Sequence, residues 1–253
     1  MTTKREITWA TVLSCAAGIC VSGSALAVVK NYNAPLIGNI SAGGNWTPAG
    51  APAITDNWIF PIAAAYTVTF DPPAADGSIE LAFNAPATVT VFNTGGPHVT
   101  PLMRVGGVAA SATVSVNSGS FQPDELLVAS LQAGVVGNLS FRNAGTILRM
   151  QDNGLVRIGD NIACDGTLGL FNGALMTDET NPPGVPTDTG RIVLGADGKL
   201  IVNDADLTLD EWDLDMTAGG SVTLSNNAVV EVGDLDMGAT SVIRGAGTMY
   251  WVT

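Results

Sequence analysis

Apolar and polar residues alternate in short runs along most of this chain, and one alternating phrase occurs twice near its C-terminal end. Asp-Leu-Asp-Met stands at residues 213–216 and again at 234–237, so the two copies lie 21 residues apart. A period of this length is typical of one coil of a β-solenoid. The alternation puts the leucines and methionines on one face of a strand and the aspartates on the other, and stacked coils bury the apolar face continuously.

The same pattern predicts a core and further strands. We expect an inward row at the C-terminal end made of Leu214, Leu235, Val222 and Val242. Other runs that predict strands occupy residues 66–70, 78–83, 87–92, 112–116, 125–129, 138–141, 146–150, 155–158 and 167–171. Residues 177–190 are polar and contain three prolines. We expect them to leave the solenoid as a loop, either a binding loop or a tolerated insertion.

Turn residues around short strands resemble the opening coil of secreted bacterial β-helix repeat proteins. Residues 45–52 read NWTPAGAP, residues 56–60 read DNWIF, and the strand at 66–70 reads YTVTF. A fuller form of the repeated phrase occupies residues 103–129. This resemblance, to autotransporter-passenger-like and pectin-lyase-like solenoids, implies an all-β, single-stranded parallel β-helix that is right-handed and lies outside the cytoplasm. It implies no particular activity.

The chain is expected to divide into three parts. Lys4, Arg5, the apolar run 7–21 and the small residues at 25–27 are typical of a signal peptide that ends at residue 27. A retained membrane helix is the weaker interpretation, because the apolar run is short for a bilayer. Residues 28–52, rich in glycine and proline, are expected to form an N-terminal extension or cap, and residues 53–253 the solenoid.

Composition agrees with an exported all-β protein. The formal net charge is −13, and without residues 1–27 the chain keeps 8 basic and 22 acidic residues. This balance excludes the usual mode of nucleic-acid binding, which neutralises phosphates with Lys and Arg. The 30 glycines and 13 prolines interrupt runs rich in β-branched residues. Only Cys164 remains after residue 27, so no internal disulfide is expected.

Few residues are suited to catalysis. The single histidine, His98, stands among glycines and prolines and is expected to be a solvated loop residue; Cys164 has no neighbouring base. The pectin-lyase-like resemblance implies a basic residue beside paired carboxylates, but residues 200–243 hold nine Asp or Glu and no Lys or Arg. We therefore expect no catalytic residues and no enzyme. Carbohydrate binding or polysaccharide cleavage is the alternative. Three tryptophans are expected either in the core or as sugar-stacking platforms: Trp46, Trp58 and Trp212.

The repeated aspartates are the candidate metal site. Stacked in register, Asp213 would lie beside Asp234 and Asp215 beside Asp236, about 4.8 Å apart between strands. Two carboxylates at that distance repel by about 1 kcal/mol in water and about 3 kcal/mol at an effective dielectric near 20. A calcium ladder would relieve this repulsion. The other interpretation is an acidic solvated face that blocks sideways aggregation. No other cofactor is expected.

The C-terminal residues predict assembly. A β-helix exposes an open strand edge at its end, and residues 247–253 carry two aromatic side chains there. We expect an assembly surface made of Met249, Tyr250, Trp251 and Val252, which pairs with a free strand from residues 28–44 of the next subunit. In the alternative, the two aromatics fold back as a lid on a monomer. The sequence thus predicts an extracellular structural or adhesive solenoid that self-assembles head-to-tail into filaments or a surface layer. Glycans are a further partner class, and no nucleic acid or transmembrane anchor is expected.

Overall fold

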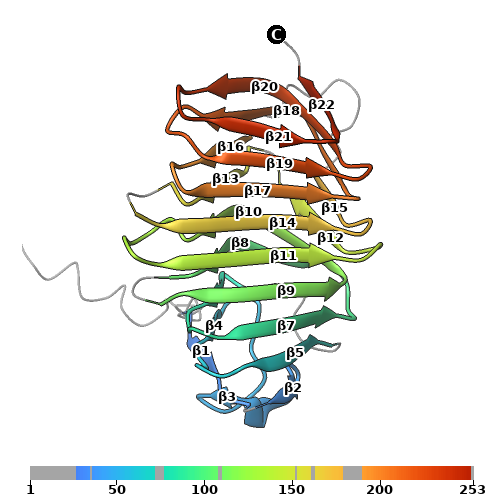
Figure 1. Cartoon of the computed structure of the whole chain (residues 1–253). Coiled ribbons are helices and arrows are strands. Elements are labelled where there is room, and N and C mark those ends of the chain that lie inside the picture. The colour runs from blue at the N-terminus through green and yellow to red at the C-terminus, as the bar shows by residue number, and fades with distance from the viewer. Residues whose placement is uncertain are drawn as a thin grey trace, which may run out of the picture.

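The computed structural model describes residues 27–34, 36–71, 77–107, 110–151, 153–160, 163–178 and 190–251. In these ranges the protein is a parallel β-solenoid of about 8 turns, and Figure 1 shows its strands stacked in chain order. The predicted fold class is confirmed, while the handedness of the coil stays a prediction. A single 3₁₀ turn, η2 (Gly43–Asn45), is the helical element of this part of the chain, and no helix there is long and apolar enough to cross a membrane.

Two sheets make up the solenoid. Sheet A has 13 strands: β1 (Val29–Tyr32), β3 (Trp46–Thr47), β4 (Asn57–Phe60), β6 (Glu80–Phe83), β8 (His98–Val105), β10 (Ser120–Val128), β12 (Ile147–Met150), β13 (Leu155–Ile158), β15 (Leu175–Asp178), β16 (Arg191–Leu194), β18 (Asp206–Met216), β20 (Val229–Met237) and β22 (Thr248–Trp251). Sheet B, in front in Figure 1, has nine strands: β2 (Ile37–Asn39), β5 (Tyr66–Phe70), β7 (Thr88–Asn93), β9 (Ala112–Ser118), β11 (Val136–Arg142), β14 (Asp165–Phe171), β17 (Gly198–Asn203), β19 (Ser221–Ser225) and β21 (Val242–Gly245).

The long strands of sheet A each serve two neighbours. The first half of β10 pairs with β12 and its second half with β13. In the same way β18 pairs with β15 near its start and with β16 near its end. A full coil therefore contains three strand segments, one in sheet B and two in sheet A.

Inward side chains form continuous rows from coil to coil. One row follows the second half of sheet A, each member beside the next in register: Trp58, Leu81, Met103, Leu126, Val156, Ile192, Leu214 and Leu235. All but Leu235 are fully buried, and Leu235 packs against the core. Burial of each such side chain stabilises the fold by about 1.5–3 kcal/mol.

One member of the expected C-terminal row is wrong. Val222 lies beside Ile243, which packs against the core, whereas Val242 lies beside Ser221 and is 46% exposed. The inward residue of β21 is therefore Ile243. Since side chains alternate along a strand, a shift of one residue turns the neighbouring side chain to solvent.

One corner of the coil has the same backbone device in successive turns. Asn143, Asn172, Asp204 and Asn226 all have positive φ, between 49° and 79°. Asn and Asp tolerate this left-handed conformation better than other residues that carry a Cβ. These residues turn the chain from sheet B back into sheet A.

Candidate functional site

The two Asp-Leu-Asp-Met phrases stack in the expected register. Asp213 pairs with Asp234 and Asp215 with Asp236, where β18 runs beside β20. Three of these aspartates are exposed, but Asp215 is 8% exposed. The ladder is therefore three solvated carboxylates and one that the protein surrounds.

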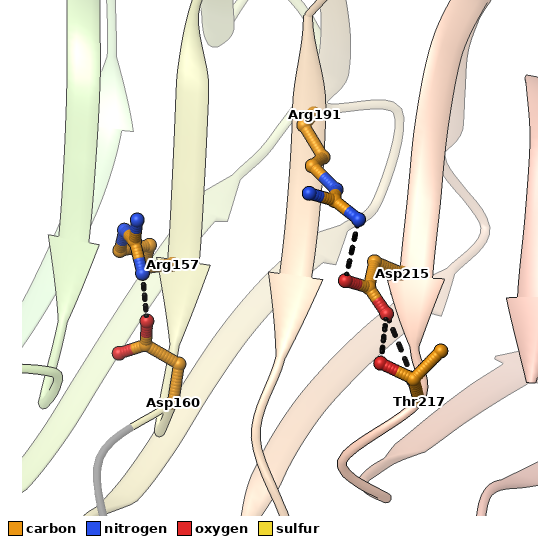
Figure 2. Close-up of polar contacts among 5 residues, drawn as sticks. All are labelled: Arg157, Asp160, Arg191, Asp215 and Thr217. Atoms are coloured by element: carbon orange, nitrogen blue, oxygen red, sulfur yellow. Dashed lines mark hydrogen bonds and ion pairs between the residues drawn. The ribbon is translucent and has the colours of Figure 1, made fainter. Parts of the chain in front are cut away.

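Asp215 is held by groups from two coils (Figure 2). Nη2 of Arg191, on β16, lies 2.8 Å from its Oδ2. The amide and the hydroxyl of Thr217 donate to its Oδ1 at 2.9 and 2.6 Å. Burial by itself would raise the pKa of Asp215, but the two bonds from Thr217 and the charge of Arg191 outweigh it and lower this pKa below its usual value.

Arg191 corrects the expectation that the acidic run has no base beside it. In register, Arg191 pairs with Asp213, so the preceding coil brings a guanidinium to the start of the ladder. The separation of acids and bases along the chain does not survive coiling, because residues about one coil apart become neighbours.

A second ion pair lies beside the first on the same side of sheet A. Nη1 of Arg157, at β13, is 2.5 Å from Oδ2 of Asp160, and Figure 2 shows both pairs on neighbouring strands. Further down, Arg104 of β8 forms an ion pair with Glu80 of β6. Basic and acidic side chains thus alternate over this face, and the unpaired acidic excess lies in the last two coils.

Calcium binding by the ladder stays a prediction. Among the described residues, no three His, Cys, Asp or Glu side chains come together as a group that could hold a metal ion. Asp215 already directs both carboxylate oxygens to protein donors. Any cation would therefore be met first by Asp213, Asp234 and Asp236.

The one histidine is part of the core, which corrects its expected place in a solvated loop. His98 opens β8, is 2% exposed, and lies among the rings of Trp58, Phe70 and Phe121. Its Nε2 is 3.1 Å from Oγ of Ser78. Burial lowers the pKa of His98 to about 3, so the ring is neutral at physiological pH.

Ser78 links this ring to a second hydroxyl. Its Oγ donates to Oγ1 of Thr100 at 3.1 Å, and Thr100 donates to the carbonyl of Leu102 at 3.1 Å. All the polar atoms of this short chain are used within the core. The arrangement satisfies buried polar groups and leaves no basic nitrogen open to a substrate.

The remaining candidates from the sequence are also interior. Cys164 is buried, its Sγ contacts the carbonyl of Gln132 at 2.7 Å, and burial raises the pKa of the thiol. The three tryptophans are core residues with at most 1% of their surface exposed: Trp46, Trp58 and Trp212. They offer no stacking platform to a sugar.

The N-terminal segment is a folded coil, which corrects the expected free strand at residues 28–44. β1 pairs with β4 and β2 with β5, both parallel, and β3 then runs antiparallel to β1. Trp46 donates from Nε1 to the carbonyl of Ile40 at 2.8 Å. Nζ of Lys30 donates to the carbonyls of Pro48, Ala49 and Gly50 at 3.2–3.5 Å. These contacts close the end of sheet A.

The C-terminal coil is open by comparison. β22 pairs with β20 and β21 with β19, and neither has a second neighbour in the described part of the chain. Tyr250 and Trp251 lie in β22, 56% and 50% exposed, so they do not fold back as a lid. Met249 packs against the core. Val252, the last residue of the expected assembly surface, lies outside the described residues, as do residues 179–189 of the expected loop and residues 1–26 of the expected signal peptide.

Comparison with known proteins adds no relative: no protein-family model, no curated protein and no solved structure matches this chain.

Proposed function

We propose that this protein is an extracellular structural or adhesive β-solenoid that self-associates through its C-terminal coil. The observation that carries the proposal is the contrast between the two ends of the solenoid. The first coil is closed by β3 and by buried aromatic rings. The last coil presents two strand edges without a second neighbour in the described chain.

Apolar side chains accompany these edges. Four side chains of the last turns are 46–56% exposed: Met237, Val242, Tyr250 and Trp251. An unpaired strand edge with exposed apolar residues favours pairing with another strand, since the free N–H and C=O groups then gain partners while apolar surface leaves water. The occupant we propose is the same coil of a second copy.

The geometry favours a pairing of like ends. A head-to-tail filament would need an open edge at the N-terminal coil, but β3 covers that edge in sheet A, leaving only the three-residue β2 at the edge of sheet B. Contact between two C-terminal coils uses one surface twice and closes as a dimer. Extracellular location rests on the signal-peptide pattern and on the fold without disulfides.

Light scattering and electron microscopy test the association. The wild-type chain is expected to dimerise with rising concentration, and Trp251→Glu to remain a monomer because a charge on the edge opposes pairing. Leu36→Glu, a charge on an exposed apolar residue of the N-terminal coil, is the matched control and should leave the dimer intact. A wild type that stays monomeric contradicts the proposal; filaments abolished by Leu36→Glu would establish the head-to-tail arrangement instead.

A second candidate function, polysaccharide binding or cleavage on sheet A, is supported by the Arg191–Asp215 contact, which puts a base beside paired carboxylates. Polygalacturonate is a suitable probe, with formation of unsaturated ends as the readout. Activity lost in Arg191→Gln but kept in Arg157→Gln would favour this candidate. An inactive wild type leaves the structural function alone.

A further inference from the structure

Two adjoining recesses lie on the outer face of sheet B, away from the ion pairs and from the C-terminal coil. The first, of about 390 Å³, lies over β2, β5 and β7. The second, of about 230 Å³, lies over β7, β9 and β11, and both are lined by Thr88. They follow the starts of these strands, which stack one above another in the lower half of Figure 1. Together they form one groove along the solenoid axis.

The groove carries no charge. Its lining consists of threonine and serine hydroxyls, alanines, and a few larger apolar residues, on a chain whose formal net charge is −13. A cationic ligand finds no carboxylate there, and a polyanion finds no Lys or Arg while the net charge of the protein repels it. The chemistry of the groove thus selects an uncharged ligand.

Three threonine hydroxyls in the first recess are free to bind. Thr67, Thr88 and Thr90 make no side-chain hydrogen bond to another described residue. In the second recess Ser111 accepts from the amide of Val136 at 3.0 Å and Thr113 from Nδ2 of Asn138 at 3.3 Å, so each hydroxyl still has its proton to donate. The groove therefore offers donors throughout and free acceptors at its lower end.

These hydroxyls form a regular grid. Thr67 pairs with Thr90, and Thr88 pairs with Thr113, on adjacent parallel strands. Adjacent strands lie about 4.8 Å apart, and residues i and i+2 on one face lie about 6.6 Å apart. Apolar side chains flank the grid: Leu36 and Ile37 are 68% and 76% exposed, and Val136 is 38% exposed. A ligand that repeats hydroxyl groups along its length and has apolar C–H surface beside them would fit both features.

We infer that this groove binds an uncharged polysaccharide chain lying along the solenoid axis. Sugar units repeat hydroxyls at regular intervals and present C–H faces between them, which match the threonine grid and its apolar flanks. An extended peptide is less well served, because β5, β7 and β9 are paired on both sides and offer no free ladder to a new strand. The inference would give the adhesive part of the proposed function a surface. It does not depend on self-association or on the sheet A site.

Affinity electrophoresis tests the groove directly. The whole chain is run through gels that contain a soluble neutral glucan, xylan or mannan, with polygalacturonate as the anionic comparison. We expect at least one neutral polysaccharide to retard the wild type and polygalacturonate to have no effect. Thr88→Arg, which puts bulk and charge where the recesses join, should weaken binding by about tenfold or more.

Two further variants separate binding from folding. Thr69→Arg makes the same change on the same face of β5, outside both recesses, and should bind like the wild type. Thr88→Val removes only the hydroxyl and should weaken binding by about two- to tenfold while the melting temperature is kept. Failure of every neutral polysaccharide to retard the wild type, or equal loss in Thr69→Arg, would overturn the inference. Binding of polygalacturonate alone would do so as well and would direct attention to Arg191 and its neighbours.

Discussion

Arg191 and Asp215 stand on adjacent strands, 22 and 21 residues removed from their equivalents in the neighbouring coil, with Nη2 of the arginine 2.8 Å from Oδ2 of the aspartate. The contact joins the last basic residue of sheet A to the first carboxylates of the acidic ladder. It is the point at which the charge of this face changes sign along the solenoid.

Replacing Arg191 by Gln should raise the pKa of Asp215, because the cation is one of the groups that lower it. The carboxylate is favoured in the folded state, so its contribution to stability is present above the usual pKa of 3.8 and is lost as the pH falls through the lower folded-state value. At neutral pH we expect a loss of about 1 kcal/mol or less, since the arginine is half exposed.

Carboxyl titration by NMR and urea unfolding measure the two effects. Arg157→Gln, which breaks the neighbouring ion pair with Asp160, is the control and should leave the titration of Asp215 unchanged. An unaltered Asp215 titration in Arg191→Gln would show that the Thr217 bonds alone set it.

The fold was readable because the solenoid repeats its pattern in the sequence. The spacing of 21 residues between the two Asp-Leu-Asp-Met phrases is the register found between β18 and β20. The same spacing carried through the next strand would have placed Ile243, not Val242, beside Val222. Likewise, one coil length back from Asp213 leads to Arg191. Both corrections follow from applying the period strictly.

Other features have no such signal. His98 is buried by rings from different coils, and its glycine- and proline-rich flanks are typical of a loop. The N-terminal coil depends on long-range contacts, such as those of Lys30 with the carbonyls of residues 48–50. The sheet B groove arises from the relative positions of strand starts. These are properties of the assembled solenoid, which no local alternation encodes.

The two neighbours in β21 give a matched test of the C-terminal register. Ile243→Asp should lower the free energy of unfolding by about 2 kcal/mol or more, because it places a charge without a partner against the core. Val242→Asp, at an exposed position, should change it by about 0.5 kcal/mol or less. Leu235→Asp should behave like Ile243→Asp. Urea unfolding of the three variants checks the register, and equal losses at residues 242 and 243 would contradict it.

The calcium ladder is tested by melting curves. If Asp213, Asp234 and Asp236 bind calcium, millimolar calcium should raise the melting temperature, with about 1.4 kcal/mol of added stability at ten times the dissociation constant. Asp213→Asn with Asp234→Asn should abolish the increment. Asp215→Asn should keep most of it, because Arg191 and Thr217 already engage that carboxylate. An unchanged wild-type melting temperature would leave the ladder as an acidic solvated face.

His98 should make the solenoid sensitive to mild acid. The ring stays neutral in the folded state down to a pH of about 3, whereas in the unfolded chain it takes up a proton near pH 6.5. Stability is therefore full above pH 6.5 and falls as the pH is lowered from there toward 3, by at most about 1.4 kcal/mol per pH unit. Carboxylates add their own dependence only nearer their pKa values, so the window from pH 6.5 to 5 reports mainly on this histidine.

A glutamine at position 98 has no titrating group and can still offer a polar partner to Ser78. We expect His98→Gln to be less stable than the wild type at pH 7.5, because it loses ring contacts with Trp58 and Phe70. Its unfolding free energy should nevertheless be nearly flat between pH 6.5 and 5, where that of the wild type declines. Urea unfolding at four pH values in this window compares the slopes. Parallel slopes for the two proteins would mean that another group causes the acid sensitivity and that His98 is not held neutral by its burial.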